Sequence, residues 1–323
     1  MGKKLVVACD FLTDWQKERI RLSAMEYDYD LTFFEDEEAA KGSRELRECE
    51  VLFSRTCALI PETKALKWAA SSNAGVEPYL EPGVFPSGET VLTNSAGAYG
   101  VTISEHVVMV TLMMLRQMPR YQAYMREKEW HRKLPVRSIY GSTVTVLGTG
   151  DIGRNVARRM KALGAASVIG FSRSGKSSEP AFDMVLKSEQ MDEYLPTTDI
   201  LTMSMPNTPE TKGLLSRERI GLLPAHAVVV NVGRGTTVDQ DALVEALNAG
   251  KIAGAALDVM VPEPLDPENP LWSAKNCILT PHVSGDMSLG YTADTTVDLF
   301  RENMALYAEG KPLKRVVNRK LGY

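Results

Sequence analysis

Residues 142–174 read STVTVLGTGDIGRNVARRMKALGAASVIGFSRS, and this stretch decides the fold that the sequence predicts. The short apolar run at residues 144–147 favours a buried strand. Gly148, Gly150 and Gly153 then match the pattern G-x-G-x-x-G. The first glycine allows a tight turn after the strand, the second lets the backbone approach a pyrophosphate, and the third lets the following helix pack closely.

A helix and a second strand complete this unit. Apolar residues recur at intervals of three and four from Ile152 to Leu163, and Gly164 ends the helix. The strand Ser167–Phe171 follows. The N-terminus of this helix presents free N–H groups and a partial positive charge to phosphates. The glycines could also form a turn in an unrelated α/β domain, but the strand before them and the helix and strand after them favour the dinucleotide site. We expect a dinucleotide to be bound by Gly148, Gly150, Asp151, Ile152 and Gly153.

Length, charge and cysteine usage narrow the class of protein. A chain of 323 residues predicts two domains. The net charge of -4 provides no basic surface for nucleic acid or anionic membranes. The apolar run Val107–Leu115 is too short to span a membrane, and Met1–Asp10 lacks the apolar core of a signal peptide, so we expect a cytoplasmic protein. Four scattered cysteines predict reduced thiols and no metal site.

Strands and helices alternate along the chain, which predicts an α/β fold with open, doubly wound parallel sheets. In the first hundred residues we expect strands at Lys4–Cys9, Leu31–Glu35, Val51–Ser54, before Ser71 and at Val91–Thr93, and helices at Trp15–Met25 and Ser43–Glu50. Later strands are expected at Ile200–Met205, Ala227–Val232, Ile252–Val259 and Cys277–Thr280, and helices at Asp239–Ala249 and Tyr291–Glu309. We expect the last helix to return to the first domain.

A long apolar helix is expected after the loop Ser95–Gly100. Thr102 and Glu105 fit the capping box T-x-x-E, and Pro119 is expected to stop the helix. Because Val107–Leu115 is apolar on all sides, we expect this helix to be buried all round. Burial at a subunit interface and burial between the chain's own domains are both consistent with the pattern. The polar residues 126–137 are then expected at the surface.

The small-residue segment Ser72–Val76 follows a predicted strand end. Its backbone N–H groups can bind an anion. The same residues also suit an ordinary turn between a strand and a helix, so both interpretations stay open.

Ionisable residues follow three successive strands near the predicted dinucleotide site. Arg234 lies in NVGRG, Glu263 lies in PEP, and His282 lies in TPHVSG; Asp258 also stands at a strand end. In a doubly wound sheet, ligands bind outside the carboxyl ends of the strands. We therefore expect these side chains to share a site, although each alone would also suit a solvated loop or a rigid turn.

This combination suits hydride transfer to a 2-oxo acid. A guanidinium holds a carboxylate and polarises the neighbouring carbonyl, which is the role expected of Arg234. A histidinium supplies the proton that the carbonyl oxygen takes up, which is the role expected of His282. Glu263 would orient the imidazole and favour its charged form. The other histidines are less suited, because His106 lies in the apolar helix, where a structural hydrogen bond is expected, and His131 and His226 are in polar or loop segments.

At this point the sequence resembles the D-isomer-specific 2-hydroxyacid dehydrogenase family over nearly its whole length. The matching motifs are SSNAGVEPYL, SEHVVMVTLMMLR, VLGTGDIG, MPNTPETKGLL, VVVNVGRGTTVDQDALVEALNAGKIAGAALDVMVPEPL, ILTPHVSG and FRENMALYAEGKPLKRVVN. The resemblance implies a Rossmann dinucleotide-binding domain, residues 100–288, inserted into a flavodoxin-like substrate-binding domain. That second domain would comprise residues 1–99 and a returning C-terminal helix within residues 289–323.

The resemblance also implies roles for particular residues. Arg234 and His282 would bind substrate and, with Glu263, carry out catalysis, and Asp258 would contact the nicotinamide end of the cofactor. Asn73, Ala74 and Gly75 would bind the substrate carboxylate, and the long helix from Val101 would help to form a homodimer. Further cofactor contacts would come from Met205, Pro206, Thr211, Val232, Gly233 and Gly285.

Three departures from the family pattern stand out. GVE replaces the commoner GVD at residues 75–77, and no regulatory extension follows Tyr323, which disfavours the long phosphoglycerate dehydrogenases. NAD-dependent members usually carry an acid after the second strand, because the acid binds the adenosine ribose and repels a 2′-phosphate. Here the chain has hydroxyls and cations instead, so we expect NADP to be preferred, with NAD also possible, through Ser172, Arg173, Ser174 and Lys176.

The sequence therefore predicts an oxidoreductase that reduces a small 2-oxo acid, such as glyoxylate or hydroxypyruvate, to the D-2-hydroxy acid. A cofactor-sensing corepressor of the same fold is the alternative from another class. Formate dehydrogenase is a third option within this fold. Formate oxidation releases no hydroxyl proton, so Glu263 would have no acid/base histidine to support, and its presence counts against this option. Candidate residues for the substrate pocket are Phe53, Ser54, Arg55, Tyr99 and Met287.

Overall fold

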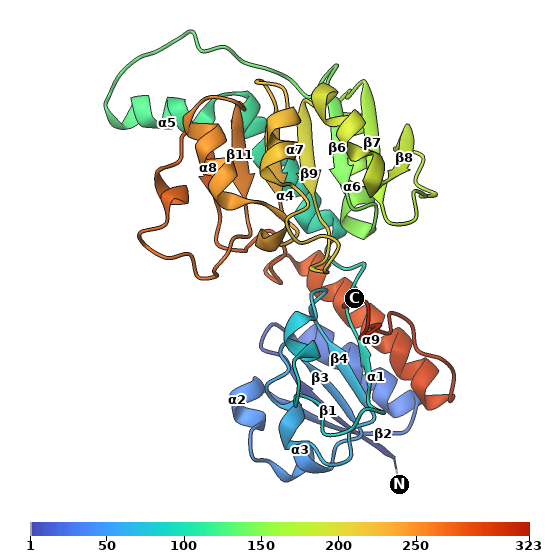
Figure 1. Cartoon of the computed structure of the whole chain (residues 1–323). Helices are drawn as coiled ribbons and strands as arrows, with labels where there is room; N and C mark the ends of the chain where they lie inside the picture. Colours follow the sequence, from blue (N-terminus) through green and yellow to red (C-terminus); the bar gives the residue numbers. More distant parts are fainter. Residues whose placement is uncertain (1) are drawn as a thin grey trace. The chain divides into compact units, whose positions relative to one another are not determined.

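The computed structural model describes residues 2–323. Its contacts divide the chain into two compact units. Unit 1 comprises the residues up to Tyr99 together with Asp286–Tyr323, and unit 2 is Gly100–Gly285. Both units are visible in Figure 1. The second division lies three residues before the predicted end of the inserted domain.

Unit 1 contains a five-stranded parallel sheet in the order β2-β1-β3-β4-β5. This is the flavodoxin-like order. The strands are β1 (Lys3–Ala8), β2 (Tyr29–Phe34), β3 (Val51–Ser54), β4 (Trp68–Ser71) and β5 (Val91–Thr93). The helices are α1 (Asp14–Glu26), α2 (Glu37–Ala40), α3 (Arg44–Glu48) and α9 (Gly290–Ala308), with short 3-10 turns η1 (Ile60–Glu62) and η2 (Glu77–Leu80).

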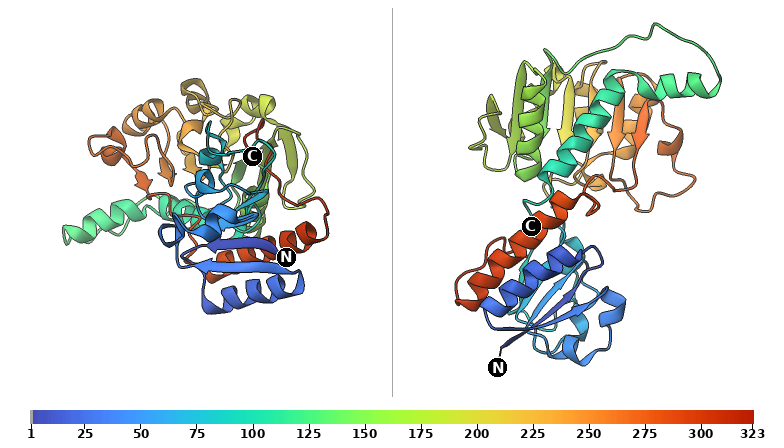
Figure 2. Two further views of the ribbon diagram at one scale, coloured as in Figure 1. Left: turned by 90° about the horizontal axis from the view of Figure 1, so that it is seen from below. Right: turned by 180° about the vertical axis from the view of Figure 1, so that it is seen from behind.

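The C-terminal helix α9 belongs to the core of unit 1. It packs beside α1 on one face of the sheet, as both views in Figure 2 show. Phe300 of α9 stacks on Phe53 of β3 with ring centroids 4.2 Å apart, and Trp68 of β4 lies against the same ring. Because these side chains come from opposite ends of the chain, unit 1 is complete only when residues after unit 2 return to it.

Unit 2 contains a seven-stranded parallel sheet in the order β12-β11-β10-β9-β6-β7-β8. The strands are β6 (Thr143–Leu147), β7 (Ser167–Ser172), β8 (Met184–Lys187), β9 (Ile200–Met203), β10 (Val228–Asn231), β11 (Gly254–Leu257) and β12 (Cys277–Leu279). The helices are α4 (Gly100–Leu115), α5 (Met118–Arg126), α6 (Asp151–Ala162), α7 (Arg217–Leu222) and α8 (Gln240–Asn248). Four 3-10 turns are η3 (Ser188–Glu193), η4 (Leu195–Thr197), η5 (Gly235–Thr237) and η6 (Pro270–Ser273).

The strand order in unit 2 reverses at β6, with β7 on one side and β9 on the other. This reversal is the topological switch point at which dinucleotide-binding sheets hold their ligand. Helices α4 and α6 pack together on one face, and α7 and α8 cover the other through a large apolar core. The predicted class, two doubly wound parallel-sheet domains with a Rossmann domain inserted into a flavodoxin-like one, is confirmed.

The predicted boundaries of the long helix were wrong. Helix α4 begins at Gly100, so Thr102 is a helical residue and does not form the expected capping box. It ends at Leu115, and Pro119 stands at the second position of the next helix, α5, where a proline is tolerated because the N–H it lacks has no helical partner.

Helix α4 is also not buried all round within this chain. Met109 is 48% exposed and Leu112 is 37% exposed. The sequence pattern recorded only that these side chains are apolar, and it contained no information on which of them the chain itself covers. Strand β8 was missed as well, and none of its four residues is buried.

None of the helices formed by residues 2–323 combines the length and the apolar character needed to cross a membrane. Over the same residues, no group of three or more histidine, cysteine, aspartate or glutamate side chains is arranged to hold a metal. All four cysteines are free thiols.

Candidate active site

The glycine turn after β6 has the form required for a dinucleotide. Gly148 has φ +96°, a conformation that side chains rarely adopt. A Cβ at Gly153 would overlap the carbonyl oxygen of Gly148, so the helix approaches the turn as closely as glycine permits. Gly150 faces open space and caps α6 without a side-chain hydrogen bond. The cap residue therefore has no side chain to cover the first N–H groups of α6, and N–H groups at a helix N-terminus can bind a pyrophosphate.

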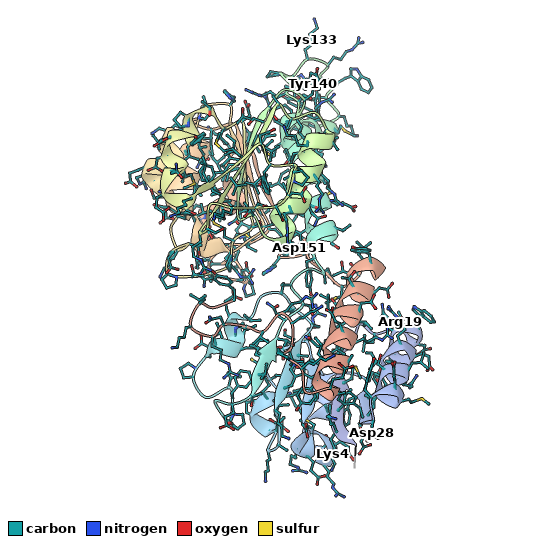
Figure 3. The ribbon with its side chains drawn as sticks, turned by 90° about the vertical axis from the view of Figure 1, so that its right-hand side faces the viewer. Lys4, Arg19, Asp28, Lys133, Tyr140 and Asp151 are labelled. Atoms are coloured by element: carbon teal, nitrogen blue, oxygen red, sulfur yellow. The ribbon has the colours of Figure 1, made fainter. Side chains whose placement is uncertain are left out.

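The carboxylate of Asp151 does not contribute to this phosphate cradle. Asp151 is the first residue of α6 and is labelled in Figure 3. Its Oδ1 accepts a hydrogen bond from Asn155 Nδ2 at 3.2 Å, and its buried Oδ2 is packed against Gly100. A role of Asp151 in cofactor binding therefore rests on its main chain.

The end of β7 carries hydroxyls and cations. Ser172 and Ser174 have their Oγ atoms 3.5 Å apart, and Ser174 Oγ accepts the N–H of Lys176 at 3.3 Å. The side chains of Arg173 and Lys176 are exposed. A hydrogen bond with Thr208 and attraction by Arg173 lower the pKa of Glu210, in the loop after β9.

The next acid along the chain is engaged elsewhere. Asp183 Oδ2 accepts the N–H of Val168 at 2.7 Å and pairs with Lys161 at 2.6 Å. Burial raises the pKa of Asp183, but the contacts with Lys161 and Val168 outweigh it and lower the pKa overall. Asp183 is thus held at the amino end of β7, and β7 ends without an acid.

Loops after three neighbouring strands meet at the carboxyl edge of the sheet. Gly148, after β6, lies against Ser204 and Met205, after β9. A Cβ at Gly233, after β10, would lie 2.8 Å from the oxygen of Met205. In the same region, Thr211 Oγ1 donates to the oxygen of Pro206 at 2.7 Å, and the N–H of Val232 donates to Met203 at 3.0 Å. Of the sequence-predicted cofactor residues, Met205 therefore lies against the glycine turn and Gly233 lies against Met205, while Pro206, Thr211 and Val232 belong to the same two loops.

Arg234 is held by the buried side chain of Asn231. Asn231 Nδ2 donates to the oxygen of Arg234 at 2.9 Å, and Asn231 Oδ1 accepts the N–H of Gly233 at 3.1 Å. The guanidinium of Arg234 donates to the oxygen of Gly233 at 2.7 Å. Sequence reasoning missed Asn231, although its place at the end of an apolar strand, where a polar residue needs a partner, was a usable signal.

Asp258 shapes the turn that carries His282. It is 1% exposed, and its carboxylate accepts hydrogen bonds from Thr280 Oγ1 at 2.5 Å, Val283 N at 3.0 Å and Ser284 N at 2.9 Å. Burial raises the pKa of Asp258, but the hydrogen bonds from Ser284, Thr280 and Val283 outweigh it and hold the pKa below its ordinary value. The ionised carboxylate therefore organises residues 280–284.

The same loop fixes the backbone of His282. Its φ is +55°, and its N–H donates to the oxygen of Asp258 at 2.8 Å. A non-glycine residue in this conformation is uncommon and is kept there by its surroundings.

His282 and Glu263 form a direct pair. His282 Nδ1 lies 2.7 Å from Glu263 Oε2, and Glu263 Oε1 accepts the N–H of Met260 at 3.0 Å. The side chains are 48% and 36% exposed, respectively. Because the pair uses Nδ1, the second ring nitrogen, Nε2, is left to exchange a proton with a ligand. A Cβ at Gly235 would overlap the backbone of Met260, so the loops that carry Arg234 and Glu263 touch.

In unit 1, the segment Ser72–Val76 presents free N–H groups. Asn73 Nδ2 donates to the oxygen of Arg55 at 2.9 Å, and Asn94 Nδ2 donates to the oxygen of Ala74 at 2.9 Å. Within residues 2–323, the N–H groups of Ala74 and Gly75 donate to no acceptor. Both residues are partly exposed, which suits an anion-binding turn.

Several candidate pocket residues lie elsewhere. Phe53 is fully buried against Phe300 and is part of the core. Ser54 is buried and its Oγ donates to the oxygen of Thr56 at 2.9 Å. The buried Tyr99 hydroxyl donates to the oxygen of Ser72 at 2.8 Å, which braces the segment Ser72–Val76 from below. Met287 is buried, and Arg55 is partly exposed and pairs with Asp10 at 3.5 Å.

The remaining histidines have structural partners. His106 Nε2 lies 3.4 Å from Thr280 Oγ1, and burial lowers the pKa of His106. His131 pairs with Glu129 at 2.8 Å, and His226 pairs with Asp199 at 2.9 Å.

Comparison with known proteins identifies the class. The model of the D-isomer specific 2-hydroxyacid dehydrogenase NAD binding domain matches residues 108–284. The chain therefore belongs to the D-isomer specific 2-hydroxyacid dehydrogenase family, as the sequence motifs indicated.

Individual relatives resemble the chain to different extents. It is 32% identical to D-3-phosphoglycerate dehydrogenase of Archaeoglobus fulgidus over 262 residues, which are 80% of this chain and 49% of the relative. The chain thus spans about half the length of that relative. It is 31% identical to glyoxylate/hydroxypyruvate reductase A of Serratia proteamaculans over 263 residues, 80% of this chain and 82% of the relative.

A solved structure is similar over both whole chains. It is an NADPH-dependent glyoxylate/hydroxypyruvate reductase from Sinorhizobium meliloti in complex with NADP and sulfate, with a TM-score of 0.81 and 27% identity.

Proposed function

We propose that this protein reduces a small 2-oxo acid to the D-2-hydroxy acid with NADPH. The observation that carries the proposal is the 2.7 Å contact between His282 Nδ1 and Glu263 Oε2, on loops at the carboxyl edge of the sheet that also holds the glycine turn. A carboxylate on Nδ1 leaves Nε2 as the atom that exchanges a proton with substrate, which is the arrangement that carbonyl reduction needs.

Each proposed catalytic residue has a distinct task. The nicotinamide cofactor, when bound, supplies the hydride. Arg234 holds the substrate carboxylate and polarises the carbonyl. In unit 1, the N–H groups of Ala74 and Gly75, in the turn that Asn73 braces, are proposed to bind a carboxylate. His282 gives the carbonyl oxygen its proton through Nε2, and Glu263 keeps the imidazole oriented through the contact of its Oε2 with Nδ1. In the reverse direction His282 takes that proton back.

The remaining proposed roles concern the cofactor. Gly148, Gly150 and Gly153 and the first N–H groups of α6, at Asp151 and Ile152, receive the pyrophosphate. We assign the part of the cofactor beyond the pyrophosphate to the loops after β9 and β10, which contain Met205, Pro206, Thr211, Val232 and Gly233. We assign Asp258 and Gly285 to the nicotinamide end of the cofactor. The main role of Asp258 is to hold the turn of His282, because its carboxylate oxygens already accept three hydrogen bonds.

NADPH is proposed over NADH because of the end of β7. A 2′-phosphate carries a charge of about -1.5 to -2 and several acceptor oxygens, as phosphate monoesters do. Arg173 and Lys176 supply cations there, Ser172 and Ser174 supply hydroxyls, and Asp183 is occupied by Lys161 and Val168. The similar Sinorhizobium enzyme is NADPH-dependent, which supports this choice. NAD remains a usable second cofactor in this proposal.

The experiment is turnover with defined substrates. Purified protein is mixed with NADPH and either glyoxylate or hydroxypyruvate, and cofactor oxidation and the product are measured. We expect oxidation with both acids, and D-glycerate rather than L-glycerate from hydroxypyruvate. Binding of NADPH without turnover of any 2-oxo acid in a panel would contradict the proposal and favour the corepressor alternative.

We also propose a homodimer formed through α4 and the segment after it. Met109 and Leu112 are exposed on α4, and α5 has no buried residue. In Figure 2, α5 extends away from the sheet of unit 2 and the segment after it runs back as a long loop, in which Trp130 is 90% exposed. Figure 3 labels Lys133 and Tyr140 at this end of unit 2. Exposed apolar side chains of this extent are typical of a subunit interface.

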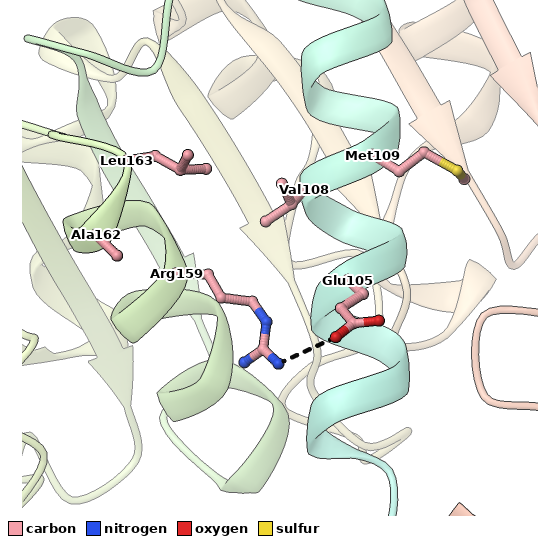
Figure 4. Close-up of a pocket in the computed structure, with 6 residues that line it drawn as sticks. All are labelled: Glu105, Val108, Met109, Arg159, Ala162 and Leu163. Atoms are coloured by element: carbon pink, nitrogen blue, oxygen red, sulfur yellow. Dashed lines mark ion pairs between the residues drawn. The ribbon is translucent and has the colours of Figure 1, made fainter. Parts of the chain in front are cut away.

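A groove beside α4 adds to this surface. It is lined by Val108 and Met109 of α4 and by Ala162 and Leu163 at the end of α6, and the Glu105–Arg159 ion pair of 3.5 Å closes one end (Figure 4). We expect the wild-type protein to sediment at twice the mass of the chain. The double variant Met109→Asp/Leu112→Asp should sediment as a monomer, whereas Met25→Asp, at an exposed methionine of α1, should leave the dimer intact. A monomeric wild type at micromolar concentration would contradict the proposal.

A further inference from the structure

We infer that Gln240 is a positioning residue that fixes the loop carrying Glu263, and through it the orientation of His282. This inference rests on the proposed function. Gln240 is the first residue of α8 and lies outside the residues assigned above to substrate or cofactor.

Gln240 makes two hydrogen bonds with the backbone of a single loop residue, Val261. Its Nε2 donates to the oxygen of Val261 at 2.7 Å, and its Oε1 accepts the N–H of Val261 at 2.8 Å. An amide group is the side chain that can both donate and accept in this way. The pair reproduces the contact of a neighbouring β-strand, although no strand lies there.

The loop has little else to hold it. Residues 261–264 are all exposed, and Pro262 and Pro264 have no N–H to donate. Among residues 2–323, the hydrogen bonds of this segment are the two to Gln240, the bond from Met260 N to Glu263 Oε1 and the His282–Glu263 contact. Removing the amide of Gln240 therefore leaves the carboxylate of Glu263, through its contacts with Met260 and His282, as the remaining hydrogen-bonding group of the loop.

Helix α8 makes Gln240 a firm anchor. Asp239 caps the helix by accepting the N–H of Ala242 at 3.0 Å, and Ala242 and Leu243 are buried in the apolar core against the sheet. On the other side, the close approach of Gly235 to Met260 fixes where the loop begins. The position of the Glu263 carboxylate thus depends on two contacts. Its Oε1 accepts the N–H of Met260, and Gln240 holds the backbone of the next residue, Val261.

Three variants separate the hydrogen bonds from the bulk of the side chain. Gln240→Met keeps a similar volume and removes both hydrogen bonds. Gln240→Glu keeps an acceptor for the N–H of Val261 but turns a second acceptor toward the carbonyl oxygen. Asp241→Asn is the matched control, because Asp241 is exposed on the same helix and has no partner among the described residues.

Kinetics give the first readout. With hydroxypyruvate and NADPH, Gln240→Met should lower kcat about five- to tenfold, the loss expected from two modest hydrogen bonds, with the KM for NADPH unchanged. The pH above which reduction falls off should move downward, as in Glu263→Gln but less. In the double variant Gln240→Met/Glu263→Gln, the Gln240 change should add nothing further, since its effect acts through Glu263.

Nuclear magnetic resonance of ¹⁵N-histidine-labelled protein gives a readout independent of turnover. It reports which ring nitrogen of His282 carries the proton, with the signal assigned from His282→Ala. The Glu263 contact predicts a proton on Nδ1 in the wild type. Glu263→Gln should reduce that preference, Gln240→Met and Gln240→Glu should reduce it in the same direction, and Asp241→Asn should leave it unchanged.

The two readouts keep failure of this inference apart from failure of the proposed function. An inactive wild type in which Gln240→Met still alters the His282 tautomer would overturn the function and support the positioning role. An active wild type with an unchanged tautomer and pH profile in Gln240→Met, or fully additive losses in the double variant, would overturn the positioning role alone.

Discussion

At the scale of single residues, the site depends on a few buried polar groups that hold exposed ones in place. Asn231 brackets the loop of Arg234, and Asp258 organises the turn of His282. The exposed side chains are the ones that we assign to chemistry. Changes at the two kinds of residue should therefore differ in effect, because a chemical role affects turnover and a holding role also affects stability.

Arg234→Lys tests the chemical role of the guanidinium. Lysine keeps the positive charge but loses the planar fork that holds a carboxylate with two hydrogen bonds. We expect kcat/KM for hydroxypyruvate to fall at least about 100-fold, or roughly 2.7 kcal/mol. NADPH binding, measured by fluorescence titration, should be retained. Near-normal turnover and KM in this variant would remove Arg234 from the site.

His282→Ala tests the proton donor. General acid catalysis contributes about 10²- to 10⁴-fold, so we expect a loss of kcat in that range for 2-oxo acid reduction. NADPH affinity should stay within about twofold, because the proposed contact is with substrate. A variant that loses cofactor affinity as strongly as turnover would indicate a structural role instead.

Asp258→Asn tests the holding role and carries a pH dependence. The variant leaves the N–H groups of Val283 and Ser284 with a poorer acceptor, so we expect unit 2 to lose about 1–3 kcal/mol of stability at pH 7. Since the pKa of Asp258 is lowered on folding, its ionised form stabilises the protein above the unfolded-state pKa of about 3.9. That contribution is lost as the pH falls through the lower, folded-state pKa.

The difference in urea unfolding free energy between wild type and Asp258→Asn should therefore be constant from about pH 7 to pH 5 and shrink below pH 4. A difference that grew on acidification would contradict the ionised state of Asp258.

At the scale of elements, the carboxyl end of β7 decides the cofactor. Arg173→Asp replaces a cation with the acid that NAD-dependent members carry in this region. We expect kcat/KM for NADPH to fall about 100-fold or more, with much less change for NADH. Arg21→Asp, an exposed arginine on α1, is the control for the change in charge. Equal losses with both cofactors would show that Arg173 does not meet the 2′-phosphate.

Elements with a clear period were predictable from the sequence. The strands β1, β3 and β10 and the helices α1 and α9 lie within two residues of the predicted bounds. The three strands were predictable because each contains a short run of buried apolar residues. The prediction failed at the ends of α4 and α5. Thr102 suits either a helix cap or the first turn, and Pro119 suits either the end of one helix or the first turn of the next. The prediction also failed for the exposure of Met109, which is set by tertiary packing.

The candidate site was predictable to a similar degree. Arg234, Glu263 and His282 were found because they follow strands whose ends meet at one edge of a parallel sheet. Asn231 was missed although its partners, Gly233 and Arg234, are close in sequence. Thr280 and Gln240 were missed because each acts through a contact with a residue more than twenty positions away. A single sequence contains no direct record of such pairs, and the residue types are common in unrelated turns.

At the scale of the whole molecule, unit 2 is inserted in the chain between the two segments that form unit 1. Phe300 and Trp68 belong to the same core although unit 2 separates them in sequence. Unit 2 carries the glycine turn and the His282–Glu263 pair, and unit 1 carries the free N–H groups of Ala74 and Gly75. The proposed reaction uses residues of both units. We therefore expect a fragment that contains one unit alone to fold or to bind its ligand without turning over substrate.

The pH dependence of 2-oxo acid reduction in Glu263→Gln shows whether Glu263 and His282 act as a pair in the reaction. Kcat/KM for hydroxypyruvate with NADPH is measured from about pH 5 to pH 10 in wild type and variant. A carboxylate beside an imidazole favours the protonated ring, so we expect the alkaline limit of activity to move to lower pH in the variant, with part of the activity retained at acid pH. An alkaline limit at the same pH in both proteins would show that Glu263 and His282 are not coupled in the reaction and would contradict the account.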